Sequence, residues 1–148
     1  MTLLFNKLKF CIAVIAATLL LFTTSGCKKE SETVDSTAFF NNNVLNKTLT
    51  IHLAIDNGAN VTSNYSAYTF TCATGGVFTA ANNLFSVTGT WAANADFSKV
   101  TFTLPTPPSE FIFLNREWTF TKFTTPILEL GYSTTAGGDN KILHFQKQ

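Results

Sequence analysis

The chain has 148 residues and a mass of 16.2 kDa, so it can hold one domain and a targeting segment but not two domains. Its formal net charge is only +1 and 13% of its residues are charged, which gives no electrostatic reason to expect nucleic acid as a partner. Removal of a targeting segment would leave enough chain for a single hydrophobic core of modest size.

The N-terminal residues have the three zones of a signal peptide. Lys7 and Lys9 give a positive start, and residues 10–22 form an apolar run that is too short for a comfortable membrane span. Small side chains follow at residues 23–26 and fit the requirements of a signal peptidase. We therefore predict a signal peptide over residues 1–26.

The cysteine that follows these zones is part of a recognisable motif. The stretch Thr24-Ser25-Gly26-Cys27 resembles a bacterial lipobox, although Thr24 stands where such motifs usually carry an aliphatic residue. The resemblance implies cleavage between Gly26 and Cys27 and acylation of Cys27, which would anchor the protein to a membrane through its acyl chains. An ordinary secretory signal followed by a chance cysteine is the alternative.

The residues after the cysteine bear on the location of the protein. The order Cys27-Lys28-Lys29-Glu30 is similar to lipoproteins of the Bacteroidota type. That resemblance implies the outer membrane of a bacterial cell envelope, facing either the periplasm or the cell surface. The predicted partner is then the membrane itself, with an envelope protein as a further partner of unknown identity.

Residues 27–36 predict a tether between the lipidated cysteine and the folded part. They are charged or small and nearly free of apolar side chains, as a solvated linker should be. The tether leads into residues 37–46, where four apolar side chains fall on one stripe and predict a short helix.

From residue 48 onward the apolar residues recur with a period of two, which is typical of strands with one buried face. Residues 48–55 alternate strictly and are ended by Asp56-Asn57-Gly58, a strong turn sequence. The pattern predicts eight strands, over residues 48–55, 65–72, 77–81, 84–92, 99–104, 116–123, 127–133 and 141–147.

The connections between these strands are short, which suits antiparallel neighbours. We predict an all-β fold, an eight-stranded antiparallel up-and-down barrel with one or two short helical segments; a β-sandwich fits the same alternation and stays open. Residues 105–115 are the exception, because prolines break the strand there. Ser109 could cap one helical turn, with Phe111 and Leu114 plugging an end of the sheet or covering its edge.

Two short motifs add a resemblance to this pattern. Thr88-Gly89-Thr90-Trp91 and Glu117-Trp118-Thr119-Phe120, with the strand rhythm around them, resemble small lipocalin-like lipoproteins. The resemblance implies a lipocalin-like β domain over residues 37–148, with an up-and-down barrel and an apolar cavity. In lipocalins the Gly-x-Trp belongs to the first strand, whereas here it falls in the fourth predicted strand.

The chain has few of the residue types that usually perform enzyme chemistry. Cys11 would be removed with the signal and Cys27 acylated, which leaves Cys72 without a disulfide partner and predicts a buried, inert thiol. His52 and His144 alternate with the core positions and predict solvated side chains rather than a metal pair. We therefore predict no enzymatic activity, no metal site and no cofactor.

Aromatic residues are the main hint of ligand binding. Arg116, Trp118, Phe120 and Lys122 share one face of a predicted strand. If that face points inward, Arg116 is a candidate anchor for a ligand carboxylate, with Trp118, Phe120 and Trp91 as walls. A packed aromatic core is the alternative to such a cavity.

Two functions therefore stay open from the sequence. The first is an anchored lipoprotein that binds a small hydrophobic or amphipathic ligand in its barrel. The second is a packed β domain that acts as a protein or glycan interaction module on the cell envelope.

Overall fold

The computed structural model describes residues 34–105, 108–134 and 137–148. The predicted signal peptide, Cys27 and residues 27–33 of the predicted tether lie outside these residues. A helix with the length and hydropathy needed to cross a membrane is absent from the part of the chain that the structure describes.

The first described element is the helix α2, Ser36–Asn43. It begins at Ser36 because the Asp35 carboxylate accepts a hydrogen bond from the Ala38 N–H at 3.0 Å, as an N-cap should. The prediction of a helix to residue 46 was too long. The chain turns away at Asn46, whose φ is 56° and whose N–H donates to the Cys72 carbonyl at 2.8 Å.

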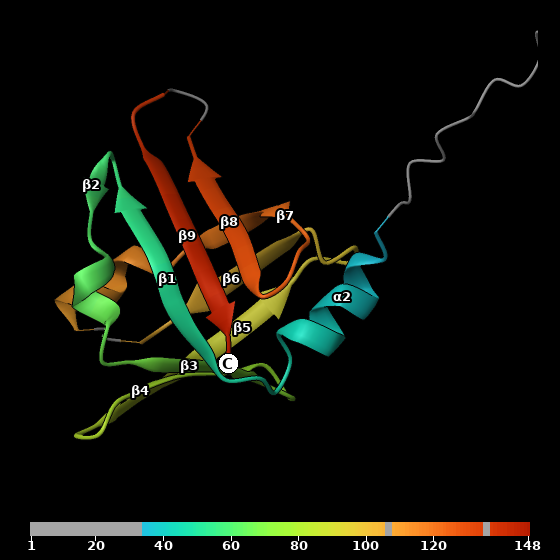
Figure 1. The fold of residues 1–148 in the computed structure, drawn as a ribbon, viewed down its shortest axis with the longest axis horizontal. Helices are drawn as coiled ribbons and strands as arrows, with labels where there is room; N and C mark the ends of the chain where they lie inside the picture. Colours follow the sequence, from blue (N-terminus) through green and yellow to red (C-terminus); the bar gives the residue numbers. More distant parts are fainter. Residues whose placement is uncertain (1–33, 106–107, 135–136) are drawn as a thin grey trace, which may run out of the picture. The chain divides into compact units, whose positions relative to one another are not determined.

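Within the described residues, nine strands form one antiparallel sheet with the order β2-β1-β3-β4-β5-β6-β7-β8-β9. Because β1 also pairs with β9 along its length, eight strands close into a barrel, and β2 is a short addition to β1 (Figure 1). The strands are β1 Leu49–Asp56, β2 Ala59–Asn60, β3 Thr69–Ala73, β4 Val77–Ala81, β5 Ser86–Ala93, β6 Lys99–Thr103, β7 Glu117–Lys122, β8 Ile127–Ser133 and β9 Asn140–Lys147.

This closed sheet confirms the predicted eight-stranded antiparallel barrel and excludes the sandwich. The main errors are at strand ends. The strand predicted from residue 65 begins only at Thr69, because Thr62–Tyr65 form the 3₁₀ helix η1. β5 begins two residues late, because the Asn82 side chain accepts hydrogen bonds from the Leu84 and Phe85 N–H groups and holds a turn there.

The strand β2 was not predicted. It follows the turn at Asn57 and Gly58, whose φ values of 49° and 86° are both positive, as the two central residues of a type I′ hairpin require. The two residues Ala59 and Asn60 then pair with Asp56 and Ile55, a strand too short to leave a period in the sequence.

The barrel interior is filled by side chains from the inward faces of the eight barrel strands. Phe78 stacks on Phe102 with ring centroids 4.4 Å apart, and Phe70 packs against Phe145 at 5.5 Å. Burying each such side chain contributes about 1.5–3 kcal/mol. The largest fully buried side chains are Trp118, Tyr65, Phe40, Phe70, Phe78, Phe111, Phe145, Leu49, Leu104, Leu114, Leu128 and Leu143.

Each end of the barrel is covered by a helical segment. The α2 end consists of α2 with the strand connections at 74–76, 94–98 and 123–126; Phe39 of α2 packs against Phe123 at 5.4 Å. The η2 end consists of η1, the 3₁₀ helix η2 (Ser109–Phe113) and the ends of the strands beneath them.

The segment η2 bears out the predicted helical turn in the 105–115 connection. Phe111 and Leu114 are fully buried beneath it, as predicted for a plug. The predicted cap was wrong, because Pro108 stands at the N-cap and no side chain caps the turn.

Candidate functional site

The four predicted ligand-binding residues do not form one site. Trp118 and Phe120 are buried, so the face of β7 that carries them does point into the barrel. Arg116 and Trp118 lie at the η2 end, whereas Phe120 contacts Phe39 of α2 and Trp91 contacts Phe40 of α2 at the opposite end. The structure therefore brings these residues together only in pairs.

The two buried members of the set are held by contacts within the chain. The Trp118 indole N–H donates to the Leu114 carbonyl at 3.1 Å, and its ring lies 5.2 Å from Phe113. Phe120 stacks on Phe123 with ring centroids 5.3 Å apart. Both side chains are core residues that fasten the covering segments to the barrel.

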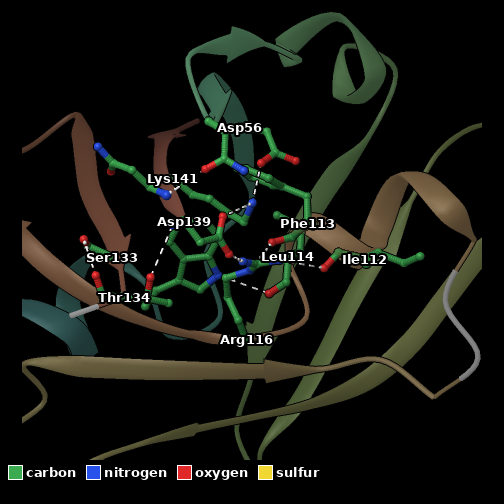
Figure 2. Close-up of polar contacts among 12 residues, drawn as sticks. Asp56, Ile112, Phe113, Leu114, Arg116, Ser133, Thr134, Asp139 and Lys141 are labelled. Atoms are coloured by element: carbon green, nitrogen blue, oxygen red, sulfur yellow. Dashed lines mark hydrogen bonds and ion pairs between the residues drawn. The ribbon is translucent and has the colours of Figure 1, made fainter. Parts of the chain in front are cut away.

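Arg116 is the residue whose role the geometry defines best. Its Nε donates to the Phe113 carbonyl at 2.8 Å and its Nη2 to the Ile112 carbonyl at 3.3 Å, so the guanidinium holds η2 by two backbone oxygens. Its Nη1 pairs with Asp139 Oδ2 at 3.4 Å, and its Cζ lies 4.9 Å from the Tyr132 ring centroid. Figure 2 shows the polar contacts of the Arg116 guanidinium with Ile112, Phe113 and Asp139.

Lys141 completes a cluster of two cations and two carboxylates beside Arg116 (Figure 2). Its side chain is only 6% exposed, and its Nζ donates to Asp56 Oδ1 and lies 2.7 Å from Asp139 Oδ1. Both contacts join opposite charges, so the Lys141 ammonium is shared by two carboxylates.

The electrostatics of this cluster favour the charged forms. Burial lowers the pKa of the Lys141 ammonium, but the hydrogen bonds to Asp139 and Asp56 outweigh it and leave the pKa raised. The hydrogen bond from Lys141 in turn lowers the pKa of the Asp139 carboxyl. Lys141 and Asp139 are therefore both favoured in their charged forms, and the cluster pairs two cations with two carboxylates, which suits a structural clasp better than acid-base catalysis.

A depression of about 320 Å³ opens beside the cluster, between η1, η2 and the ends of β1 and β9. Across it the Tyr65 hydroxyl donates to the Glu110 carbonyl at 2.6 Å, and the Tyr68 hydroxyl lies 3.4 Å from Glu110 Oε1. Burial, with the nearby carboxylates of Asp56 and Glu110, raises the pKa of the Tyr65 hydroxyl. Tyr65 is therefore a hydrogen-bond donor at physiological pH.

A second depression, of about 460 Å³, lies at the α2 end around Trp91. The Trp91 indole N–H donates to the Ala73 carbonyl at 2.8 Å, and its ring lies 4.9 Å from Phe40. Leu45 and Phe97 add to a largely apolar lining. Sequence reasoning assigned Trp91 to a candidate site. It placed Leu45 only on the apolar stripe of the predicted helix, and Phe97 stands in a connection where no alternation marks a buried side chain.

A third depression, of about 540 Å³, lies on the outer face of β7, β8 and β9. His144 is one of its lining residues, and burial lowers the pKa of the His144 imidazole. His52 is exposed at an irregularity of the β1–β9 pairing, so both histidines lie outside the core. Among the residues that the structure describes, no three His, Cys, Asp or Glu side chains are placed to hold a metal ion.

Cys72 lies in the core of the barrel. Its side chain is fully buried, and burial raises the pKa of the thiol to about 12. The thiol is therefore protonated at neutral pH, in agreement with the predicted inert cysteine.

The chain was compared with protein families, curated proteins and solved structures. No family model matches the chain, and no curated protein matches it either. The fold is similar to the crystal structure of a DUF4847 family protein from Bacteroides vulgatus, with 17% sequence identity and a TM-score of 0.49. The match covers 68% of this chain and 92% of the other chain.

Proposed function

We propose that this chain is a non-catalytic lipoprotein of a bacterial envelope, anchored through acyl chains on Cys27, whose barrel acts as an interaction module through its outer surface. The lipobox-like motif supports the anchor, and so does the distance to the fold. Asp35, the N-cap of α2, follows Cys27 by eight residues. At about 3.3–3.6 Å per residue, these eight residues allow Asp35 to lie at most about 29 Å from the acylated cysteine.

The packed interior favours an interaction module over a barrel that holds a ligand inside. Aromatic rings fill the barrel, and the α2 and η2 segments cover its two ends. A ligand inside would have to displace side chains such as Phe70 and Phe78, which are fully buried against one another. The outer surface is then the part of the domain that is free to meet a partner.

The anchor is tested by the intact mass of the protein extracted from membranes. We expect a species that begins at Cys27 and carries acyl mass, and its loss in a Cys27→Ala variant. Cys11→Ala is the matched control, because it removes a cysteine from the predicted signal and should leave the acylated species unchanged. Soluble, unmodified protein cut at another position would contradict the anchor.

The depression around Trp91 favours a second candidate function, binding of a small hydrophobic or amphipathic molecule. Its lining combines Trp91 and Phe97 with few polar groups, as ligand pockets commonly do. The chain has two tryptophans, so a Trp118→Phe variant leaves Trp91 as a single fluorescent reporter. Titration with a long-chain fatty acid should then give a saturable change, and calorimetry should lose the binding in Trp91→Ala. A linear, non-saturable response would contradict this candidate.

A further inference from the structure

The chain enters the barrel at the α2 end. The first described residues lead directly into α2, whose N-cap is Asp35. The Ser36 hydroxyl donates to the Asp96 carbonyl, which fastens the start of the helix to the 94–98 connection. An anchor at Cys27, eight residues before the N-cap, would therefore hold the α2 end nearer to the membrane than the η2 end.

The depression around Trp91 lies at this same end. Phe97 of the 94–98 connection is one of its lining residues, and Leu45, just beyond α2, is another. Val34, beside the N-cap, is 53% exposed and adds an apolar side chain at this end. A lipid surface that the anchor brings close to the α2 end would therefore meet the depression.

Charge distinguishes this depression from the two others. The lining of the depression at the η2 end includes Arg116 and Lys141, and the lining of the depression on β7, β8 and β9 includes Glu129. None of the described residues that line the depression around Trp91 is charged. Contact with an acyl region, where an unpaired charge is costly, is therefore opposed least at this depression.

Trp91 is suited to contact with lipid. Its indole N–H already donates to the Ala73 carbonyl at 2.8 Å, so lipid can cover the ring without leaving this group unpaired. Tryptophan is enriched where proteins meet the interface of a membrane. Gly75 and Gly76 also line the depression and bring no side chain that would fill it.

Phe97 is held among the lining residues against backbone strain. Its φ is 53°, in the left-handed region that a bulky residue rarely adopts. Its N–H donates to the Asn94 carbonyl at 3.1 Å, and its ring lies 5.1 Å from Phe40. Strained backbone of this kind is common at ligand clamps, so it adds to the case for a ligand at this depression.

Apolar side chains are also exposed away from the α2 end. Leu84 is 89% exposed in the turn between β4 and β5, and Ile112 is 58% exposed in η2. Ile112 lines the depression that Asp56 and Glu110 also line, and lipid contact there would draw their charges out of water. A measurement that reports on each end separately decides between the two ends.

We propose that the α2 end faces the membrane and that the depression around Trp91 takes an acyl chain of a membrane phospholipid. A phospholipid is the ligand that the proposed anchor, on which this inference rests, brings to this end. Contact of this kind reaches about 5–10 Å into the boundary between headgroups and acyl chains, so polar groups of the connections stay among the headgroups. The η2 end then points away from the lipid and stays open to a partner of the proposed interaction module.

The two tryptophans make the orientation measurable, because Trp91 lies at the α2 end and Trp118 at the η2 end. The acylated protein is reconstituted in phosphatidylcholine vesicles whose acyl chains carry bromine near the headgroups, since bromine quenches indole fluorescence only at short range. In a Trp118→Phe variant, the emission of Trp91 should fall about twofold relative to vesicles without bromine. In a Trp91→Phe variant, the emission of Trp118 should change by less than about a tenth.

A charge placed in the depression gives a second test. Ala92 is an exposed lining residue, so Ala92→Glu changes the lining without removing a core side chain. Added to Trp118→Phe, it should reduce the quenching of Trp91 at least about twofold, because the carboxylate resists contact with acyl chains. Ile112→Glu is the matched control, since it sets the same charge at the η2 end and should leave the quenching unchanged. Urea denaturation checks that each variant is folded.

A second preparation separates docking from acylation. The chain from residue 27 is coupled through the Cys27 thiol to a maleimide lipid in the same vesicles; Cys72 does not compete, because it is fully buried and its pKa is raised to about 12. The docking is then tested even if the natural protein proves not to be acylated.

Two results would overturn the proposal. One is Trp91 emission that bromine leaves unchanged in the coupled preparation, and the other is quenching of Trp118 as strong as that of Trp91. If a brominated fatty acid in solution quenches Trp91 but the brominated vesicles do not, the proposal fails in the first way and the depression is left to a soluble ligand.

Discussion

At the α2 end the barrel is closed by aromatic rings, whereas at the η2 end charged and polar contacts add to the burial of Phe111 and Leu114. Phe40 of α2 is fully buried and lies 4.9 Å from Trp91 and 5.1 Å from Phe97. At the other end Arg116 and Tyr65 bind backbone oxygens of η2, and Lys141 joins two carboxylates beside them. One end depends on buried apolar area, and the other adds directed bonds between charged or polar groups to such burial.

The difference between the ends predicts how each responds to a change. Apolar burial is non-directional and does not depend on protonation, so the α2 end should respond to lost volume. Ion pairs and charge-assisted hydrogen bonds need matched charges, so the η2 end should respond to lost charge and to acid.

The largest effect is expected from Phe40→Ala, which removes the central ring of the α2 end. A fully buried Phe replaced by Ala should cost about 3–5 kcal/mol of the free energy of unfolding, because the packed neighbours cannot collapse into the space. Urea denaturation measures the loss. A cost below about 1 kcal/mol would show that α2 is not part of the cooperative fold.

A smaller loss is expected from Lys141→Met at the η2 end. Methionine keeps the length of the side chain but removes the charge between Asp56 and Asp139, leaving two carboxylates without their shared cation. We expect a cost of about 1–3 kcal/mol, less than for a deeply buried pair because both carboxylates reach solvent. Denaturation at low and at high salt should show that added salt reduces the difference from wild type.

Much of the barrel could be predicted from the sequence, because period-two alternation depends on the buried face of each strand. The predicted bounds of 77–81 and 127–133 match β4 and β8. The predicted strand ends were wrong where a side chain competes with the hydrogen bonds between strands. Asn82 holds a turn ahead of β5, and Tyr65 turns out of the strand register to reach Glu110.

The candidate site was less predictable for a physical reason. Alternation placed Arg116, Trp118 and Phe120 on one face but left open whether that face points inward, and it gives no position along the barrel axis. It could not show that Arg116 would bind Asp139, which is 23 residues away in the sequence. That contact depends on which strand ends meet after closure, and only the folded sheet defines it.

Acid should act on the η2 end through Asp139. Its pKa is lowered in the fold by the hydrogen bond from Lys141, so the folded state holds the proton less tightly than the unfolded state. The stability that this contributes is present above the ordinary pKa of 3.8 and is lost as the pH falls through the lower, folded value.

An Asp139→Asn variant tests this dependence, because it removes the titrating group. Unfolding free energies measured between pH 5 and pH 3 should fall less steeply in the variant than in wild type. Asp96, in the connection at the α2 end, also has a lowered pKa, through hydrogen bonds from Ser98, so Asp96→Asn is the matched variant. Equal slopes in wild type and Asp139→Asn would contradict an acid-sensitive η2 end.

The smallest effect is expected from Lys99→Met, which breaks an ion pair that belongs to neither end. Lys99 Nζ lies 2.7 Å from Glu117 Oε1, as close as Lys141 lies to Asp139, but the two side chains are 44% and 53% exposed. Water solvates both charges in either state, so the loss should be about 0.5 kcal/mol or less. Because Lys99→Met and Lys141→Met make the same chemical change, their difference measures what burial and the second carboxylate, Asp56, add to an ion pair. Equal costs in urea denaturation would mean that charge alone, and not the covered position beneath η2, gives the Lys141 cluster its stabilising role.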